Sequence, residues 1–141
     1  MSQTYDPGAV VFAFRGIPLT GYAPGTFINV QRAVDGVALV VGADGESTRV
    51  KSRNRSGTIT LTLRAESPSN DVLTAAYRAD ELGLPTGRGP VTLTDLSGTS
   101  QASARDAWIQ KLPAMGFSDG SSTREWIFAT GDLDMQPGGN I

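Results

Sequence analysis

The chain has 141 residues and a formal charge of −2 at neutral pH, and it contains neither cysteine nor histidine. The missing cysteine excludes disulfides, thiolate metal sites and thiol nucleophiles, and the missing histidine removes the commonest general base and zinc ligand. The charge is too close to zero to mark a nucleic-acid binder. No apolar run approaches the ~20 residues of a membrane-spanning helix, and the first residues lack the basic start of a secretory signal. We therefore expect a soluble domain that is made in a cytoplasm.

Short strands and turns are expected in the first third of the chain. Residues 1–8 form a flexible lead-in. Residues 9–14 (AVVFAF) and 37–41 (VALVV) have apolar side chains on both faces, which predicts strands that are covered on both sides. Residues 27–32 alternate between apolar and polar side chains, and Asp44-Gly45 predicts a hairpin turn.

The clearest strand is predicted over residues 58–65. One face carries Ile59, Leu61, Leu63 and Ala65, and the other carries Thr58, Thr60, Thr62 and Arg64. Such an alternation with a period of two is typical of a strand with one buried face.

One helix is predicted to begin near Ser69 and to end near Leu82. Residues 67–71 read SPSND and combine a hydroxyl cap, an early proline and an acid in the first turn. Gly83 stands where a left-handed C-cap belongs. A single amphipathic helix cannot form its own core, so its apolar stripe should pack on a sheet. That stripe consists of Val72, Leu73, Ala76, Tyr77 and Ala79, and the first four are expected to pack on the sheet.

The last third of the chain should form three further strands. Residues 91–96 and 123–130 alternate in the manner of strands. Residues 101–112 fit a helical stripe or a long strand, and the hairpin setting and Pro113 favour the strand. Residues 135–141 are expected to be loose. The predicted fold class is mainly β, a β-sandwich or partial barrel with one flanking α-helix, in a single domain over residues 1–141.

The candidate catalytic groups of this sequence are carboxylates. Asp132 and Asp134 fit a metal or acid pair on one strand face, and Asp95 and Asp106 fit paired glycosidase acids across a hairpin. Ordinary surface acids are the favoured interpretation of both pairs. No dinucleotide or Walker-type sequence is present. The sequence therefore predicts no enzyme, no cofactor and no metal site.

A basic segment precedes the clearest strand, with alternating cations at Arg49, Lys51, Arg53 and Arg55. In an extended chain these four side chains would share one edge. Three interpretations remain open: a solvated loop, a contact with acids of a neighbouring copy, and a phosphate contact. No aromatic residue interleaves the cations, so a base-stacking platform is missing.

Four stretches in this order resemble the tail tube proteins of contractile-tailed bacteriophages. They are GADGESTR at 42–49, SGTITLTL at 56–63, SPSNDVL at 67–73 and STREW at 122–126. None is a catalytic signature, and the resemblance rests on their order and spacing over about residues 9–130.

The resemblance implies a β-sandwich-like subunit of the tail tube and secretion-tube superfold. Six subunits would form a ring whose strands join one barrel around a channel, and rings would stack through a projecting loop at residues 42–57. The implied contact residues are Asp44, Glu46, Arg49, Lys51, Arg53 and Arg55. The implied partners are further copies of the chain and the sheath, tape-measure, baseplate and terminator proteins. DNA would pass through only as transient cargo, in a virion tail assembled in the host bacterial cytoplasm.

Two alternatives remain open at this point. The first is another ring component with the same superfold, such as a terminator, a baseplate-hub ring or a secretion-tube protein. The second is a nucleic-acid-binding β-barrel that uses the cations of residues 49–55.

Overall fold

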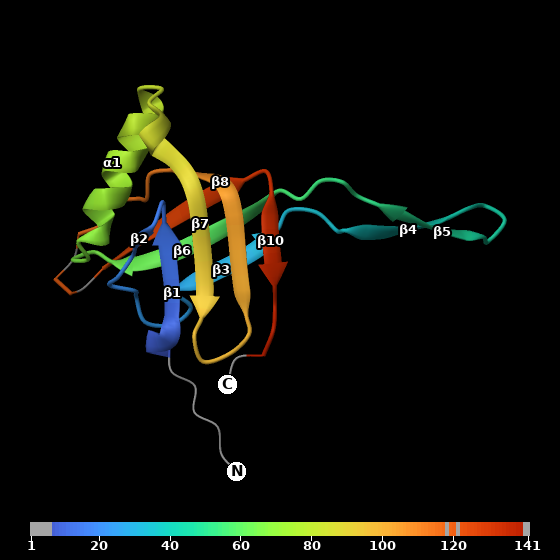
Figure 1. The fold of residues 1–141 in the computed structure, drawn as a ribbon, viewed down its shortest axis with the longest axis horizontal. Helices are drawn as coiled ribbons and strands as arrows, with labels where there is room; N and C mark the ends of the chain where they lie inside the picture. The colour runs from blue at the N-terminus through green and yellow to red at the C-terminus, as the bar shows by residue number, and fades with distance from the viewer. Residues whose placement is uncertain (1–6, 118, 121, 140–141) are drawn as a thin grey trace, which may run out of the picture.

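Strands make up most of the molecule, and the computed structural model describes residues 7–117, 119–120 and 122–139 (Figure 1). In this part the strands are β1 (Val10–Phe14), β2 (Ile17–Pro18), β3 (Ile28–Arg32), β4 (Val37–Val41), β5 (Ser47–Lys51), β6 (Gly57–Arg64), β7 (Arg88–Asp95), β8 (Gln101–Lys111), β9 (Thr123–Thr130) and β10 (Leu133–Gln136). The same part contains one α-helix, α1 (Ser69–Glu81), and two 3-10 helices, η1 (Pro7–Ala9) and η2 (Pro85–Gly87). The strand predicted over residues 101–112 is confirmed as β8.

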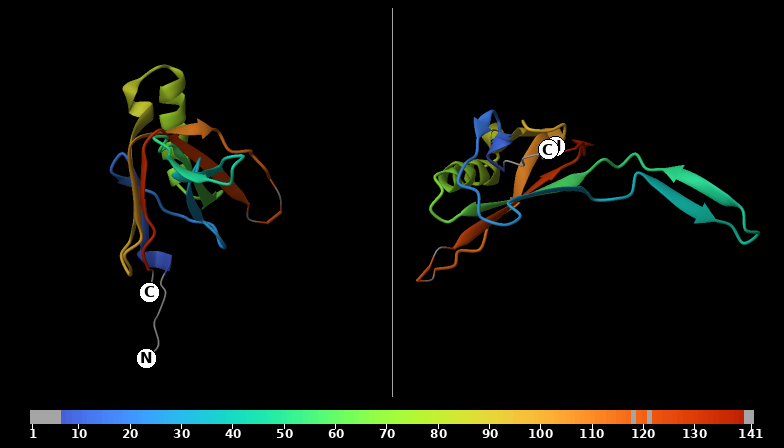
Figure 2. Two further views of the ribbon diagram at one scale, coloured as in Figure 1. Left: turned by 90° about the vertical axis from the view of Figure 1, so that its right-hand side faces the viewer. Right: turned by 90° about the horizontal axis from the view of Figure 1, so that it is seen from below.

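Strand β8 divides the main sheet into two layers. The strand order is β2-β1-β7-β8-β9-β6-β3, and β10 also pairs with β8. The first half of β8 pairs with β10, where Ala104 faces Leu133, and the second half pairs with β9, where Ala107 faces Thr130. One layer therefore holds β1, β7 and β10, and the other holds β9, β6 and β3 (Figures 1 and 2). The predicted sandwich or partial barrel with one helix is confirmed.

Aromatic side chains fill the space between the layers. The ring of Phe128 on β9 lies 5.6 Å from that of Phe12 and 5.4 Å from that of Phe14, both on β1. On β6 the predicted alternation is confirmed, because Ile59 and Leu61 are at most 1 % exposed while the threonines between them face outward, half-buried. Burying such side chains is the main stabilising term of the fold.

Helix α1 packs against the edge of this core. Leu73 is fully buried, and Ala76 and Tyr77 pack against the core cluster, whereas Val72 is only half-buried. The indole Nε1 of Trp126 donates a hydrogen bond to Asn70 Oδ1 at 2.9 Å, which joins the first turn of the helix to β9. The helix ends before Gly83, whose φ of +76° is the left-handed conformation expected there.

The C-terminal residues differ from the expected loose tail. Met135 and Gln136 belong to β10, and the backbone N–H of Thr99 donates to the carbonyl oxygen of Gly139 at 2.8 Å. The expectation for residues 135–141 is therefore wrong for 135–139, because pairing with a strand distant in sequence leaves no local signal. Residues 140–141 lie outside the described residues, as do residues 1–6 of the expected lead-in.

Replacing Phe128 by alanine tests the interlayer core. Phe128→Ala should lower the free energy of unfolding by about 3–5 kcal/mol, because it leaves a cavity between the layers. Phe117 is 82 % exposed, so Phe117→Ala is the matched control and should cost less than about 1 kcal/mol. Urea unfolding followed by circular dichroism measures both. Equal losses would contradict this account of the core.

Candidate assembly interface

The outstanding feature of the surface is an arm formed by β4 and β5. These two strands pair only with each other among the described residues, and Figures 1 and 2 show them projecting far from the body. All five residues of each strand are exposed. At the tip, Gly45 adopts a φ of +89°, and the backbone N–H of Gly42 donates to the carbonyl oxygen of Glu46 at 2.8 Å, which closes the expected hairpin turn. The backbone N–H of Glu46 also donates to Asp44 Oδ1 at 3.1 Å.

The projection differs in extent from the loop expected at residues 42–57. It begins after β3 ends at Arg32 and returns where β6 begins at Gly57, so β4 belongs to it as well. Apolar side chains on both faces of residues 37–41 had indicated a strand covered on both sides. In the subunit that strand is uncovered on both sides, so the prediction is wrong for the single copy.

The pairing of β4 with β5 gives the arm two different faces. Residues directly opposite each other in an antiparallel pair lie on the same side of the ribbon. Leu39 faces Arg49 and Val37 faces Lys51, so both cations lie on one side among apolar residues. This basic face consists of Val37, Leu39, Val41, Ser47, Arg49 and Lys51. The opposite, uncharged face consists of Ala38, Val40, Thr48 and Val50.

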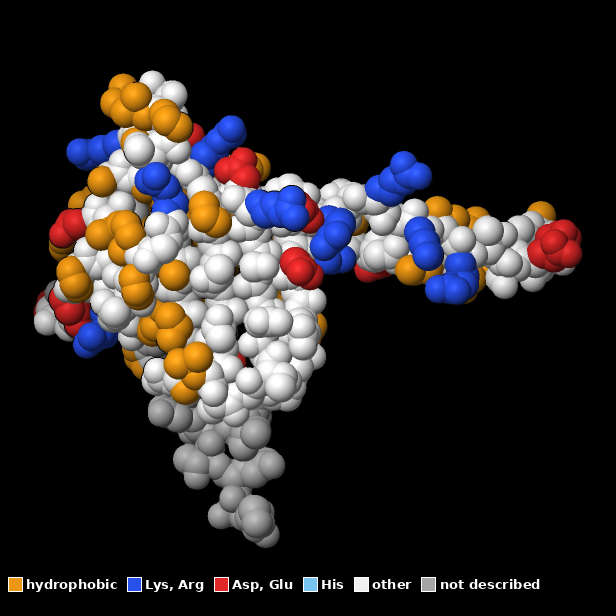
Figure 3. All heavy atoms as spheres, viewed as in Figure 1, with side chains coloured by type: hydrophobic (Ala, Val, Ile, Leu, Met, Phe, Trp, Pro, Cys, Tyr) orange, Lys and Arg blue, Asp and Glu red, His pale blue; other side chains and the backbone are white. Residues whose placement is uncertain are grey.

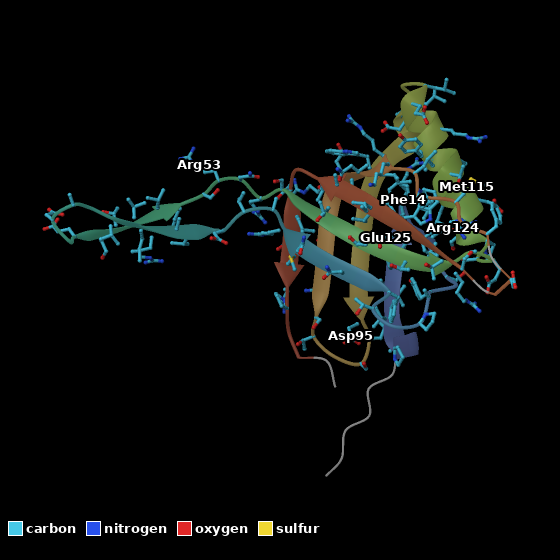
Figure 4. The ribbon with its side chains drawn as sticks, turned by 180° about the vertical axis from the view of Figure 1, so that it is seen from behind. Phe14, Arg53, Asp95, Met115, Arg124 and Glu125 are labelled. Atoms are coloured by element: carbon cyan, nitrogen blue, oxygen red, sulfur yellow. The ribbon has the colours of Figure 1, made fainter. Side chains whose placement is uncertain are left out.

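The four cations do not share one edge, so that prediction is wrong. Arg49 and Lys51 lie on the ribbon, and Arg53 lies in the irregular segment that follows, where its side chain points away from the chain (Figure 4). Arg55 turns to its own body instead, with Nε 3.3 Å from Asp132 Oδ1 and Nη2 3.9 Å from Asp134 Oδ1. Residues 52–56 between β5 and β6 are not in a strand, so the alternation of side chains is interrupted there. The alternating cations in the sequence do not reveal this interruption.

Charge is distributed unevenly along the arm. Figure 3 shows acids gathered at the tip and cations along the shaft, with hydrophobic side chains between them. The tip acids are those of the turn, Asp44 and Glu46. Among the described residues, Arg49, Lys51 and Arg53 form no ion pair, so their charges are available to a partner.

The acids considered for catalysis have structural partners. Asp132 and Asp134 pair with Arg55. Asp95 is buried and accepts hydrogen bonds from the backbone N–H and the hydroxyl of Ser97 at 3.0 and 2.8 Å, and Asp106 lies 3.7 Å from Arg88 Nε. No group of three metal-ligating side chains occurs in residues 7–117, 119–120 and 122–139.

A second candidate surface is the outer face of the β3-β6-β9 layer. Thr60 lies between Asn29 of β3 and Ile127 of β9, and Thr58 lies between Gln31 and Ala129. These two rows are uncharged and present hydroxyl, amide and apolar side chains, and in the next row Glu125 of β9 lies opposite Thr62. Strand β3 ends the layer, since none of the described strands pairs with its free edge.

No described helix is long and apolar enough to cross a membrane.

The body is a β-sandwich with one helix, and a two-stranded arm projects from it. Residues 19–138 match the family described as Bacteriophage PhiTE tail tube protein. A curated relative, Structural protein ORF10 of Pseudomonas phage KPP10, is 34% identical over 146 residues, an alignment that covers 99% of this chain and 84% of the relative. The chain therefore belongs to the PhiTE tail tube protein family. It is a structural component of the virion tail tube and not an enzyme.

Solved structures share the fold at low sequence identity. The tube-terminating cap of the anti-feeding prophage has a TM-score of 0.63 at 10% identity, covering 96% of this chain and 93% of the cap. A chain of the sheath–tube complex of an extracellular contractile injection system, PVC, has a TM-score of 0.60 at 11% identity, with coverage of 94% and 91%. A chain of the native gene transfer agent virion has a TM-score of 0.62 at 12% identity, with coverage of 94% and 99%.

Trypsin should cleave the arm of the unassembled protein before it cleaves the body. The side chains of Arg49, Lys51 and Arg53 are exposed on a segment with no core, which opens locally at little cost. Arg105 is the matched control, because its side chain is also exposed but its backbone lies in the central strand β8. Mass spectrometry of early fragments measures the order of cleavage. Cleavage at Arg105 as fast as at the arm would contradict an unsupported arm.

Proposed function

We propose that six copies of the chain form a ring, and that rings stack into the tail tube of a contractile-tailed phage. The tube would carry DNA during ejection. The observation that carries the proposal is the β4–β5 arm, whose strand residues are all exposed although all five of those in β4 are apolar. A two-stranded ribbon is marginal in water on its own. A neighbouring copy in the adjacent ring is the partner that would complete it.

Apolar burial supplies most of the cohesion in this proposal. Leu39, Val40 and Val41 are 68%, 53% and 59% exposed in the free subunit. Covering a side chain of this size is worth about 1.5–3 kcal/mol when burial is complete. An exposed ion pair contributes only about 0–1 kcal/mol. Charges would therefore fix the register of the arm, and each contact is repeated around the ring.

The proposed contact between rings uses the two signs of charge along the arm. Arg49, Lys51 and Arg53 would meet acids of the adjacent ring, and Asp44 and Glu46 at the tip would meet cations. Arg55, expected at the same contact, is paired with its own body and is assigned a different part below.

The outer face of the β3-β6-β9 layer is the proposed wall of the channel. Thr58, Thr60 and Thr62 offer short hydroxyl groups, which wet a wall without binding phosphate strongly. A charge of −2 per copy gives −12 for a ring of six, so DNA would be repelled weakly and would slide. A nucleic-acid-binding barrel that uses the arm cations is disfavoured by the same charge balance.

The proposed partners outside the tube are the sheath, tape-measure, baseplate and terminator proteins. Fold similarity to a chain of the PVC sheath–tube complex supports the sheath. Similarity to the anti-feeding prophage cap keeps a terminating ring as an alternative within the same class. The two differ in outcome, since a terminator stops at a single ring and a tube protein polymerises.

Replacing Leu39 by asparagine tests the arm as the stacking contact. Leu39→Asn should abolish tubes at protein concentrations where the parent chain forms them, because each ring would bury six unpartnered amides in place of apolar side chains. Leu82 is 78% exposed at the end of α1, and Leu82→Asn is the matched control, which should form normal tubes. Negative-stain electron microscopy and sedimentation velocity measure assembly. Normal tubes from Leu39→Asn, or a parent chain that stays monomeric, would contradict the proposal.

A further inference from the structure

We propose that Arg55 and Arg32 clamp the root of the arm to β10 and thereby fix the direction in which the arm leaves the body. This inference deepens the proposed function, because an arm that seats on a neighbouring copy must point in a defined direction. The clamp consists of Arg32, Arg55, Asp132, Leu133 and Asp134.

Two irregular legs join the arm to the body: residues 33–36 lead out from β3, and residues 52–56 return to β6. The returning leg is held by both backbone and side chain. The backbone N–H of Leu133 donates to the carbonyl oxygen of Arg55 at 2.8 Å, and Arg55 and Asp132 form an isolated parallel bridge. The Arg55 guanidinium then reaches the carboxylates of Asp132 and Asp134 at 3.3 and 3.9 Å. One arginine thus ties this leg to two acids around the start of β10.

The outgoing leg is held at the same place. Arg32 donates from Nε and Nη2 to the carbonyl oxygen of Leu133, at 3.2 and 2.9 Å. Leu133 is fully buried and lies directly against Gly57, where an added Cβ would collide with the Leu133 side chain and come within 2.7 Å of the Gln31 carbonyl oxygen. Both legs therefore converge on one buried residue of β10.

Between the body and the ribbon the two legs are irregular. Arg32 faces Gly57 in the body and Val37 faces Lys51 in the ribbon. Residues 33–36 therefore span the same gap as residues 52–56, so the returning leg has one residue more. Such a mismatch interrupts regular pairing and bends a ribbon. These irregular residues connect the clamped residues to the β4–β5 ribbon. The angle between the ribbon and the body therefore depends on the contacts of the clamp.

The ion pairs of the clamp are too weak to matter for the stability of the body, but they are strong enough to orient the arm. The side chains of Arg55, Asp132 and Asp134 are 51%, 57% and 75% exposed, and pairs at such exposure add little to global stability. The body is held by its aromatic core without them. Restricting the arm requires far less free energy than folding the body, so weak pairs suffice for orientation.

Arg53 supplies the comparison. It lies two residues away on the same leg and forms no ion pair with any described residue. The two arginines share segment and charge and differ in their contacts, so Arg53→Gln is a matched control for Arg55→Gln.

The test measures the direction of the arm in the unassembled protein. Because the sequence contains no cysteine, Ser47→Cys on the arm and Arg78→Cys on α1 give two unique nitroxide labels. Double electron–electron resonance then reports the distance distribution between arm and body. Arg55→Gln should broaden this distribution at least twofold with an unchanged Tm, and Arg53→Gln should leave it as in the parent. The exchanged pair Arg55→Asp with Asp132→Arg should restore a narrow distribution.

Two results would overturn the clamp. Arg55→Gln with the width of the parent would show that the ion pairs do not restrict the arm. Equal broadening by Arg53→Gln would show an effect of net arm charge instead. Tube formation is measured separately by electron microscopy on unlabelled protein. Absence of tubes from every variant and from the parent would overturn the proposed function while leaving the resonance result on the clamp interpretable.

Discussion

A two-stranded ribbon has no interior, and this constraint governs the β4–β5 arm. Its backbone hydrogen bonds and its side chains face water on both sides, so no buried apolar surface offsets the entropy lost when it is ordered. Leu39 and Val41 nevertheless stand exposed at its surface. Selection for a free hairpin would favour polar residues at these positions. In the proposed tube, these exposed side chains would be covered by a neighbouring copy of the chain.

The body provides the rigid support that such an arm requires. Phe12 and Phe14 pack on Phe128 between the layers, and β8 passes from one layer to the other. Strand β10 completes the arrangement beside β8, at the point where both legs of the arm leave the sheet. The same pairing that orders the C-terminal residues also brings Leu133 to the root of the arm. Through β10, the core is therefore connected to the root of the arm.

The sequence predicts the elements whose pattern is local. It does not predict features that depend on contacts with distant strands. The alternation of residues 58–65 predicts β6, and the apolar stripe around Leu73 predicts α1. Both predictions err by about one residue at the ends. Residues 37–41 are predicted as a strand covered on both sides and lie outside the predicted loop at 42–57, because apolar side chains on both faces are equally typical of a buried strand and of an interface. The pairing of Arg55 with Asp132 could not be predicted from the sequence, because it depends on the position of β10 in the fold. No alternation in the sequence reports the irregular residues between β5 and β6.

In the proposed tube, the arm packs against a copy of the chain in the adjacent ring. A cryo-electron microscopy reconstruction of the virion tail, at a resolution that shows side chains, tests it most directly. We expect six subunits per ring, with Leu39 and Val40 buried against a subunit of the next ring and Arg55 still paired with Asp132 of its own chain. An arm that lies free in solvent, or that contacts only subunits of its own ring, would contradict it.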